Sequence, residues 1–104
     1  MTTKLIGILL LTCASLATGQ TAFGNYDCGQ WFQQPAAKTW LLGYLTGINV
    51  VSTTLANSSK YDPLGNLNSA EQAYLWMNNY CKANSLKTIL DGGIDLYSEL
   101  RGKR

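Results

Sequence analysis

The sequence predicts an all-α fold: a small bundle of three main helices plus a short N-terminal one, with one disulfide. Three observations carry this prediction. Apolar residues recur at helical spacing over most of the chain after Pro35. No segment alternates apolar and polar residues over the length of a strand. Two cysteines, Cys28 and Cys81, bracket the helical region.

Residues 1–20 are expected to be a signal peptide, which leaves 21–104 as a single helical domain. Lys4 gives a basic start, an apolar stretch of about a dozen residues follows, and small residues then offer cleavage after Ala17 or Gly19. That stretch is shorter than the ~20 residues that span a bilayer, so no membrane span is expected. An N-terminal helix of the folded domain is the alternative, and the lack of an amphipathic pattern argues against it. The protein is thus predicted to be exported, either to the periplasm or out of the cell.

Export determines what the cysteines are expected to do. Cys13 lies in the leader and leaves with it, and the residues before it do not fit a lipid-attachment site. Cys28 and Cys81 remain, and in an oxidising compartment two thiols favour one disulfide. A bridge between them closes a loop of roughly 50 residues, worth about 4 kcal/mol in the chain-entropy description. Two free buried thiols are the alternative.

The first two helices are expected on either side of Pro35. A short helix is predicted within residues 26–32, with Asp27 as its N-cap and with Trp31 and Phe32 packed in the core beside the cross-link. A long helix is predicted over residues 36–55, with Pro35 in its first turn. β-branched residues weaken its second half, so a break near Ser52 stays open. Its buried face is predicted from spacing to contain Trp40, Leu41, Tyr44, Leu45, Ile48, Val51 and Leu55.

Two further helices follow a loop over residues 57–69, which holds several turn-forming pairs. Ser69 and Gln72 form a capping-box pattern that starts a helix running to about residue 83. The last helix is predicted after Asn84-Ser85 and ends at Arg101-Gly102. Spacing assigns Ala73, Trp76, Met77, Tyr80 and Cys81 to the buried face of the first of these, and Leu86, Ile89, Leu90, Gly93, Leu96, Tyr97 and Leu100 to that of the second.

Glycines inside helices need a packing or functional reason. Gly43, Tyr44 and Gly47 form a string on one flank of the long helix, and its small residues predict close packing of another helix. Gly92 and Gly93 in the last helix each cost ~1 kcal/mol relative to alanine. A tolerated soft spot and close approach of another backbone are two equally open explanations for them.

The composition argues against several kinds of chemistry. The chain has no histidine, which removes the commonest general base and zinc ligand. Two cysteines cannot complete a structural zinc site, so no metal, cofactor or catalytic residue is predicted. Lys4 leaves with the leader, so seven of the eight basic residues remain against six acidic ones, without a basic stripe. Nucleic acid is therefore not expected as a partner.

Two groups of residues are candidates for binding a partner. Tyr74 and Leu75 fall outside the buried stripe of their helix and predict an exposed patch or a homodimer contact. Asp91, Asp95 and Glu99 recur every four residues along the last helix. This row is expected to be a solvated face, and it would equally suit docking of a basic partner. A paired-acid hydrolase site is the remaining alternative.

Several strings in this chain resemble a known family. The strings are Cys28-Gly29-Gln30-Trp31-Phe32, Gly43-Tyr44 and Tyr80-Cys81-Lys82-Ala83-Asn84-Ser85-Leu86. They resemble small bacterial periplasmic domains of the HdeA-like type. They also resemble the related Rap/Tai immunity proteins, which neutralise peptidoglycan-cleaving toxins. The resemblance covers most of residues 26–100. It implies that Cys28 and Cys81 are disulfide partners, and that Gly43-Tyr44 corresponds to the motif of the long helix.

The predicted function is non-enzymatic binding of another protein after export. The resemblance implies a toxin or an unfolded client as partner, and the immunity version would inhibit a cell-wall-degrading toxin. The alternative is an HdeA-like acid-stress chaperone, which exposes apolar surface when its carboxylates protonate. With only six acidic residues, this chain would change its charge little on acidification. A small hydrolase using Asp91 and Asp95 is the second alternative.

Overall fold

The computed structural model of the protein describes residues 21–58 and 60–102. These ranges contain α2 (Cys28–Trp31), α3 (Ala36–Ala56), the 3-10 helix η1 (Pro63–Asn66), α4 (Ala70–Ala83) and α5 (Ile89–Gly102). Their β-type pairing is limited to an isolated antiparallel bridge between Asp27 and Thr88. The predicted all-α class, with three main helices and a short first one, is confirmed. The predicted signal peptide lies outside the described residues.

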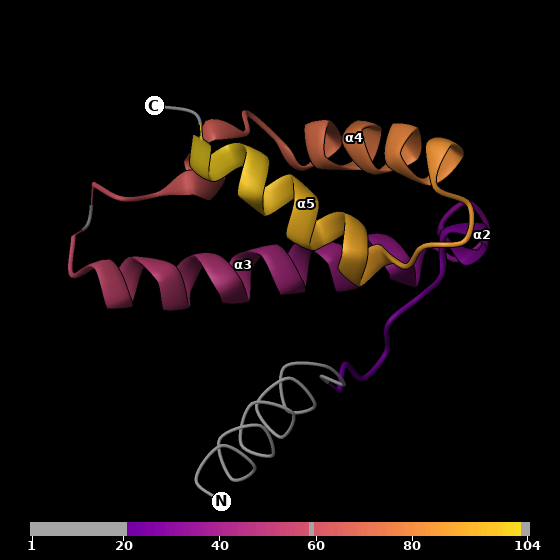
Figure 1. The fold of residues 1–104 in the computed structure, drawn as a ribbon, viewed down its shortest axis with the longest axis horizontal. Helices are drawn as coiled ribbons and strands as arrows, with labels where there is room; N and C mark the ends of the chain where they lie inside the picture. Colours follow the sequence, from indigo (N-terminus) through magenta and orange to yellow (C-terminus); the bar gives the residue numbers. More distant parts are fainter. Residues whose placement is uncertain (1–20, 59, 103–104) are drawn as a thin grey trace, which may run out of the picture.

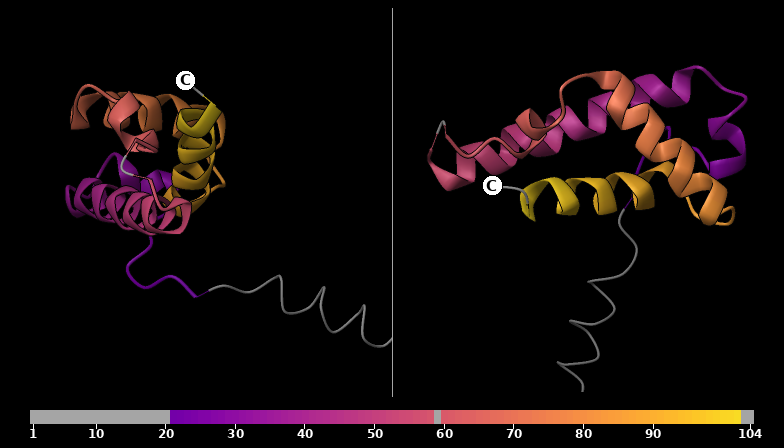
Figure 2. Two further views of the ribbon diagram at one scale, coloured as in Figure 1. Left: turned by 90° about the vertical axis from the view of Figure 1, so that its left-hand side faces the viewer. Right: turned by 90° about the horizontal axis from the view of Figure 1, so that it is seen from above.

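The chain reverses direction between its long helices (Figure 1). α4 runs back against the direction of α3, and α5 turns again and packs on both of them and on η1. Figure 2 shows α5 along one side of the pair formed by α3 and α4. The C-terminal turns of α3 extend past the end of α5 in Figures 1 and 2. α5 therefore holds the bundle together, but it leaves the far end of α3 uncovered.

α2 is short, and two local features hold it in place. The Asp27 carboxylate accepts the Gln30 N–H at 2.7 Å, and the Gln30 side chain accepts the Asp27 N–H at 3.0 Å. Asp27 is thus the N-cap, as predicted, and Gln30 completes a capping box. The disulfide joins Cys28 in α2 to Cys81 in α4, with Cα atoms 5.0 Å apart, which confirms the predicted cross-link.

The two aromatic residues at the end of α2 lie in opposite environments. Trp31 is buried, and its indole N–H donates to Asn78 Oδ1 at 2.6 Å. The prediction that Phe32 also packs in the core is wrong, because Phe32 is 55% exposed. Successive helical positions are rotated by ~100°, so the C-cap residue Phe32 leaves the face that Trp31 occupies.

α3 is one uninterrupted helix of 21 residues, so the break considered near Ser52 does not occur. Its buried residues are Ala37, Leu41 and Leu45, and Trp40, Tyr44 and Ile48 pack partly buried beside them. The predicted burial of Val51 and Leu55 is wrong, since these side chains are 56% and 81% exposed. Both belong to the second half of α3, whose last turns extend past the end of α5.

One amide fastens the chain after α3 to the rest of the bundle. The Asn49 Nδ2 group donates to Asp62 at 2.8 Å. Asn49 Oδ1 accepts the Leu64 N–H and the Tyr97 hydroxyl, both at 3.1 Å. The predicted loop over residues 57–69 therefore contains a short ordered helix, η1, and Asn49 ties it to α3 and α5.

α4 begins after Ser69, as predicted, but without the predicted reciprocal cap. The Ser69 hydroxyl makes no capping hydrogen bond. The Gln72 side chain instead accepts the N–H of Asn68 at 2.7 Å. Gln72 thus secures the residue before the N-cap, while Ser69 contributes an extended backbone conformation at the N-cap itself.

α5 begins at Ile89, later than predicted, because a capping box forms just before it. The Thr88 N–H and hydroxyl both donate to Asp91 Oδ2 at 3.0 Å, and the Asp91 N–H donates to the Thr88 hydroxyl at 3.2 Å. Leu86 lies in the turn before this cap and is 99% exposed, so its predicted burial is wrong.

The glycines that allow close packing are those of α5. A Cβ added to Gly92 would lie 2.6 Å from the Met77 sulfur, and one added to Gly93 would lie 2.9 Å from the Tyr44 ring. Side chains of α4 and α3, rather than a backbone, therefore require small residues here. The helix packing predicted at Gly43 and Gly47 is not made by any described part of the chain, because nothing lies within 4 Å of a Cβ at either position.

Candidate functional site

A groove of about 310 Å³ runs between α4 and α5. Two of the predicted partner-binding residues meet in it, Leu75 from α4 and Glu99 from α5. α4 and α5 bring them together because Gly92 of α5 leaves room for the Met77 and Tyr80 side chains of α4. The lining residues are Asn66, Leu67, Gln72, Leu75, Trp76, Asn79, Leu96, Glu99 and Leu100.

The floor of this groove is apolar, and its α4 side combines Leu75 and Trp76 with the polar Gln72 and Asn79. Leu96 and Leu100 are each 1% exposed, whereas Leu75 is 61% exposed. Trp76 is partly buried and stacks on Tyr80, with ring centroids 5.2 Å apart and planes inclined by 13°. A large exposed apolar side chain beside an aromatic ring is typical of the core of a protein-binding surface.

The α5 side of the groove is acidic. Glu99 lines it, and Asp95 lies one helical turn earlier, where it hydrogen-bonds with the Tyr80 side chain. Burial raises the pKa of Tyr80, and the charges of Asp95 and Asp91 and the hydrogen bond to Asp95 raise this pKa further. Tyr80 is therefore a protonated hydrogen-bond donor at neutral pH. None of the residues that line the groove is basic.

The predicted row of three acids divides into separate roles. Asp91 is occupied at the start of α5, where it accepts two hydrogen bonds from Thr88. Asp95 is paired with Tyr80 from α4. Glu99 is exposed and is the member of the row that lines the groove. Glu99 and Asp95 are thus the two members of the row that no cap occupies, and Asp91 is a capping residue.

Tyr74 and Leu75 do not form the single patch that the sequence predicts. The Tyr74 ring is partly buried against Trp31, with ring centroids 6.2 Å apart, and Lys38 Nζ lies 5.1 Å from its centroid. Leu75 is the next residue along α4 and lines the groove instead. Tyr74 thus helps to pack α4 on α2, and Leu75 alone is available to a partner.

Three groove residues on α4, Gln72, Trp76 and Asn79, have no binding role in the sequence analysis. Trp76 is predicted there to belong to the buried stripe, and the structure places it at the edge of that stripe. The missed signal is that positions 72, 75, 76 and 79 recur at i, i+3, i+4 and i+7. They form a second stripe along α4, beside the one that faces the core.

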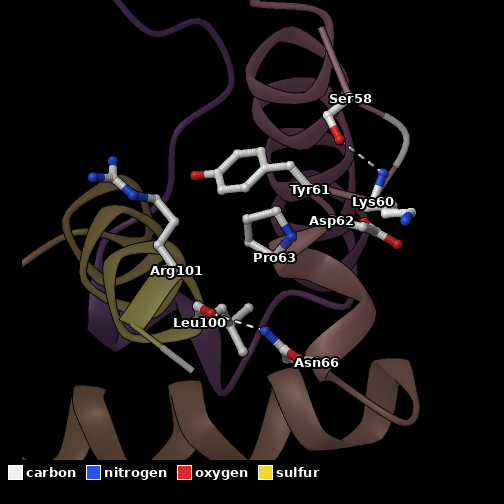
Figure 3. A pocket seen from close by; sticks show the side chains of 8 residues that line it. All are labelled: Ser58, Lys60, Tyr61, Asp62, Pro63, Asn66, Leu100 and Arg101. Atoms are coloured by element: carbon white, nitrogen blue, oxygen red, sulfur yellow. Dashed lines mark hydrogen bonds between the residues drawn. The ribbon is translucent and has the colours of Figure 1, made fainter. Parts of the chain in front are cut away.

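A second hollow, of about 420 Å³, lies between the chain after α3 and the last turn of α5 (Figure 3). Its polar groups already bond within the chain: Asp62 accepts from Asn49, and the Asn66 side chain donates to the Leu100 carbonyl at 2.9 Å. Lys60 and Arg101 stand on opposite sides of Tyr61 and Pro63 in Figure 3. These two cations do not converge on one point, so the α4–α5 groove is the better candidate site.

Within residues 21–58 and 60–102, no cluster of acidic, cysteine or histidine side chains is arranged to hold a metal ion. Over the same ranges, no helix combines the length and apolar character needed to cross a membrane.

No family model matches the chain, and neither a curated protein nor a solved structure matches it. The resemblance to HdeA-like and Rap/Tai domains therefore stays a prediction.

Proposed function

We propose that this protein acts after export as a stoichiometric binding protein and that another protein docks in the α4–α5 groove. The observation that carries the proposal is the exposed Leu75 and the Glu99 carboxylate at the two sides of an apolar floor. Full burial of a leucine side chain is worth about 1.5–3 kcal/mol. Covering Leu75 and the edge of Trp76 would thus contribute a substantial part of a micromolar affinity, which is ~8 kcal/mol.

The charges of the groove indicate the chemistry of the partner. Glu99 and Asp95 stand on the α5 side, and the lining offers no basic residue to neutralise them. A partner segment that carries an apolar side chain flanked by lysine or arginine is complementary to this arrangement. Tyr80 of α4 lies near Asp95, whose charge raises the Tyr80 pKa, so the acidic side of the groove reaches the edge of α4.

Within this class, the specific role we propose is immunity-type inhibition of a cell-wall-degrading toxin. The predicted leader and the Cys28–Cys81 disulfide support an oxidising compartment, which is where such a toxin acts. An enzyme that cleaves an acidic cell-wall polymer benefits from a basic substrate cleft, and the acidic side of the groove would complement one. The resemblance of the cysteine and glycine strings to Rap/Tai proteins supports the same role.

The proposal is tested by recovering a partner and then measuring its affinity. The oxidised mature protein serves as bait in an envelope extract, and the recovered protein is identified, purified and titrated by calorimetry. We expect one-to-one binding at micromolar affinity or tighter, and inhibition if the partner is a cell-wall hydrolase. Failure to recover any partner at micromolar bait concentration would contradict the proposal.

Two matched pairs of variants locate the binding surface. Leu75→Asp should weaken binding about tenfold or more, which is ~1.4 kcal/mol, while Leu86→Asp should leave it unchanged. Leu86 is the proper control because it is 99% exposed and does not line the groove. Glu99→Lys should likewise weaken binding, and Glu71→Lys, at an exposed position of α4 that does not line the groove, should not. Equal affinities for all four variants would place the interface elsewhere.

A further inference from the structure

A second apolar surface, separate from the groove, lies on α3. We define the α3 face as Gly43, Gly47, Val50, Val51 and Thr54, which recur at i, i+4, i+7, i+8 and i+11 along one side of the helix. Val50 and Val51 are 59% and 56% exposed, and nothing lies within 4 Å of a Cβ placed at either glycine. By helical spacing Gly43, Gly47, Val50 and Thr54 are turned away from the buried Leu41 and Leu45, and Val51 lies at the edge of this side.

Burying the α3 face in a contact would leave few polar groups without a hydrogen-bond partner. The face spans the twelve residues from Gly43 to Thr54, whose eleven steps of 1.5 Å give about 16 Å of helix. The Thr54 hydroxyl, its one polar side-chain group, already donates to the Val50 carbonyl at 2.8 Å, so covering this group leaves no donor unpaired. The 81% exposed Leu55 adjoins the face at its C-terminal end.

Charge decides which partner fits. Residues 39–58 contain no lysine, arginine, aspartate or glutamate, so the α3 face offers nothing to attract a charged surface. In a two-fold dimer each residue meets the same surface on the other copy, and an uncharged face can pair with itself without like-charge repulsion. The α4–α5 groove is different, because Glu99 and Asp95 would there oppose their own counterparts.

We propose that the α3 face is a two-fold contact between two copies of this chain, with the helices crossing where Gly43 and Gly47 allow close backbone approach. One helix face is smaller than the ~800 Å² per partner of a standard interface. The dimer is therefore weak, with a dissociation constant in the range of tens of micromolar. Because the contact does not use α4, each copy keeps its groove open.

The test is sedimentation equilibrium of the oxidised mature protein from about 1 to 300 µM, a range that brackets such a dissociation constant. We expect a reversible monomer–dimer equilibrium. Val50→Lys should weaken dimerisation at least about tenfold, because it brings two lysines together at the contact. Leu75→Lys is the matched control: Leu75 is 61% exposed, close to the 59% of Val50, but it lies in the groove. It should leave the dimer intact.

Charge complementation separates a true contact from loss of structure. Equal amounts of Val50→Lys and Val50→Glu variants should form a heterodimer when mixed, although neither variant dimerises alone. Circular dichroism checks that both variants remain helical. A wild-type protein that stays monomeric at about 300 µM would overturn the proposal. The proposal would also be overturned if Leu75→Lys disrupted the dimer and Val50→Lys did not. Failure of the Val50→Lys and Val50→Glu variants to form a heterodimer when mixed would overturn it as well. Monomeric wild-type protein that cosediments with phosphatidylglycerol vesicles would assign the face to a membrane surface instead.

Discussion

Replacing Gly92 with alanine tests the packing that creates the groove. In an ordinary helix interior, alanine is favoured over glycine by about 1 kcal/mol. At Gly92 the new Cβ would lie 2.6 Å from the Met77 sulfur and 2.9 Å from a ring carbon of Tyr80. Met77 is 0% exposed and cannot swing into solvent, and the Tyr80 ring is held by its stack with Trp76.

The size of the expected effect follows from these two opposing contributions. Overpacking a well-filled core costs typically about 1–3 kcal/mol, which exceeds or cancels the gain in helix propensity. Gly92→Ala should therefore be neutral to about 2 kcal/mol destabilising. Gly47→Ala is the matched control, since nothing lies within 4 Å of its new Cβ, and it should stabilise α3 by about 1 kcal/mol.

Thermal and urea unfolding, followed by circular dichroism, measure both variants. They are compared at low micromolar concentration, so that any association through the α3 face does not contribute. A difference of about 1–3 kcal/mol between the variants is expected, and each 1 kcal/mol corresponds to a shift in Tm of roughly 4–8 °C in a domain of this size. If Gly92→Ala proved as stable as Gly47→Ala, the close α4–α5 packing described above would be refuted.

Three other perturbations have expected outcomes of their own. Because Cys28 and Cys81 are 53 residues apart, replacing both with serine should lower the free energy of unfolding in urea by about 4 kcal/mol. Asn49→Ala removes the acceptor of two hydrogen bonds, so it should cost about 1–3 kcal/mol in the same assay. Tyr80 has a pKa raised above that of an unfolded tyrosine, which is ~10. The protonated Tyr80 therefore contributes fully to the free energy of unfolding below pH ~10, and this contribution is lost as the pH rises through the higher pKa of the folded state. Tyr80→Phe should remove this part of the loss of stability at high pH.

Each of these has a result that would count against it. Equal unfolding midpoints for oxidised wild type and the double serine variant would show that the cross-link does not constrain the unfolded chain. If Asn49→Ala left the free energy of unfolding unchanged, water would be replacing the hydrogen bonds of the Asn49 amide. The Tyr80 argument fails if wild type and Tyr80→Phe lose stability in parallel between pH 9 and pH 12.

Local signals in the sequence were sufficient to predict where the helices lie along the chain. They were less able to predict which helix faces are buried by other elements. Helical spacing and the Asp27 cap predicted α2, α3 and α4 closely, because these signals act within a few residues. The burial of Leu55 was predicted wrongly because the same spacing continues past the point where α5 ends. How far one helix reaches along another is a tertiary property that periodicity does not encode.

The candidate site shows the same division. Leu75 and Glu99 were predicted separately as partner-binding residues, one from its position off the buried stripe and the other from a row of acids. Their meeting in one groove depends on how α4 and α5 are rotated about each other, and in this arrangement Met77 and Tyr80 fill the space where a Gly92 side chain would lie. The pairing of Tyr80 with Asp95 likewise arises only once the two helices are packed.

The indole N–H signals of the three tryptophans test partner docking most directly. Trp76 lines the groove, Trp31 bonds to Asn78 beneath α4, and Trp40 bonds to the Phe23 carbonyl at 2.8 Å beside α3. In a ¹⁵N-labelled sample titrated with the recovered partner, the Trp76 signal should shift to saturation at one equivalent while the other two stay in place. A shift of Trp31 or Trp40 with Trp76 unmoved would show that the partner does not dock in the groove.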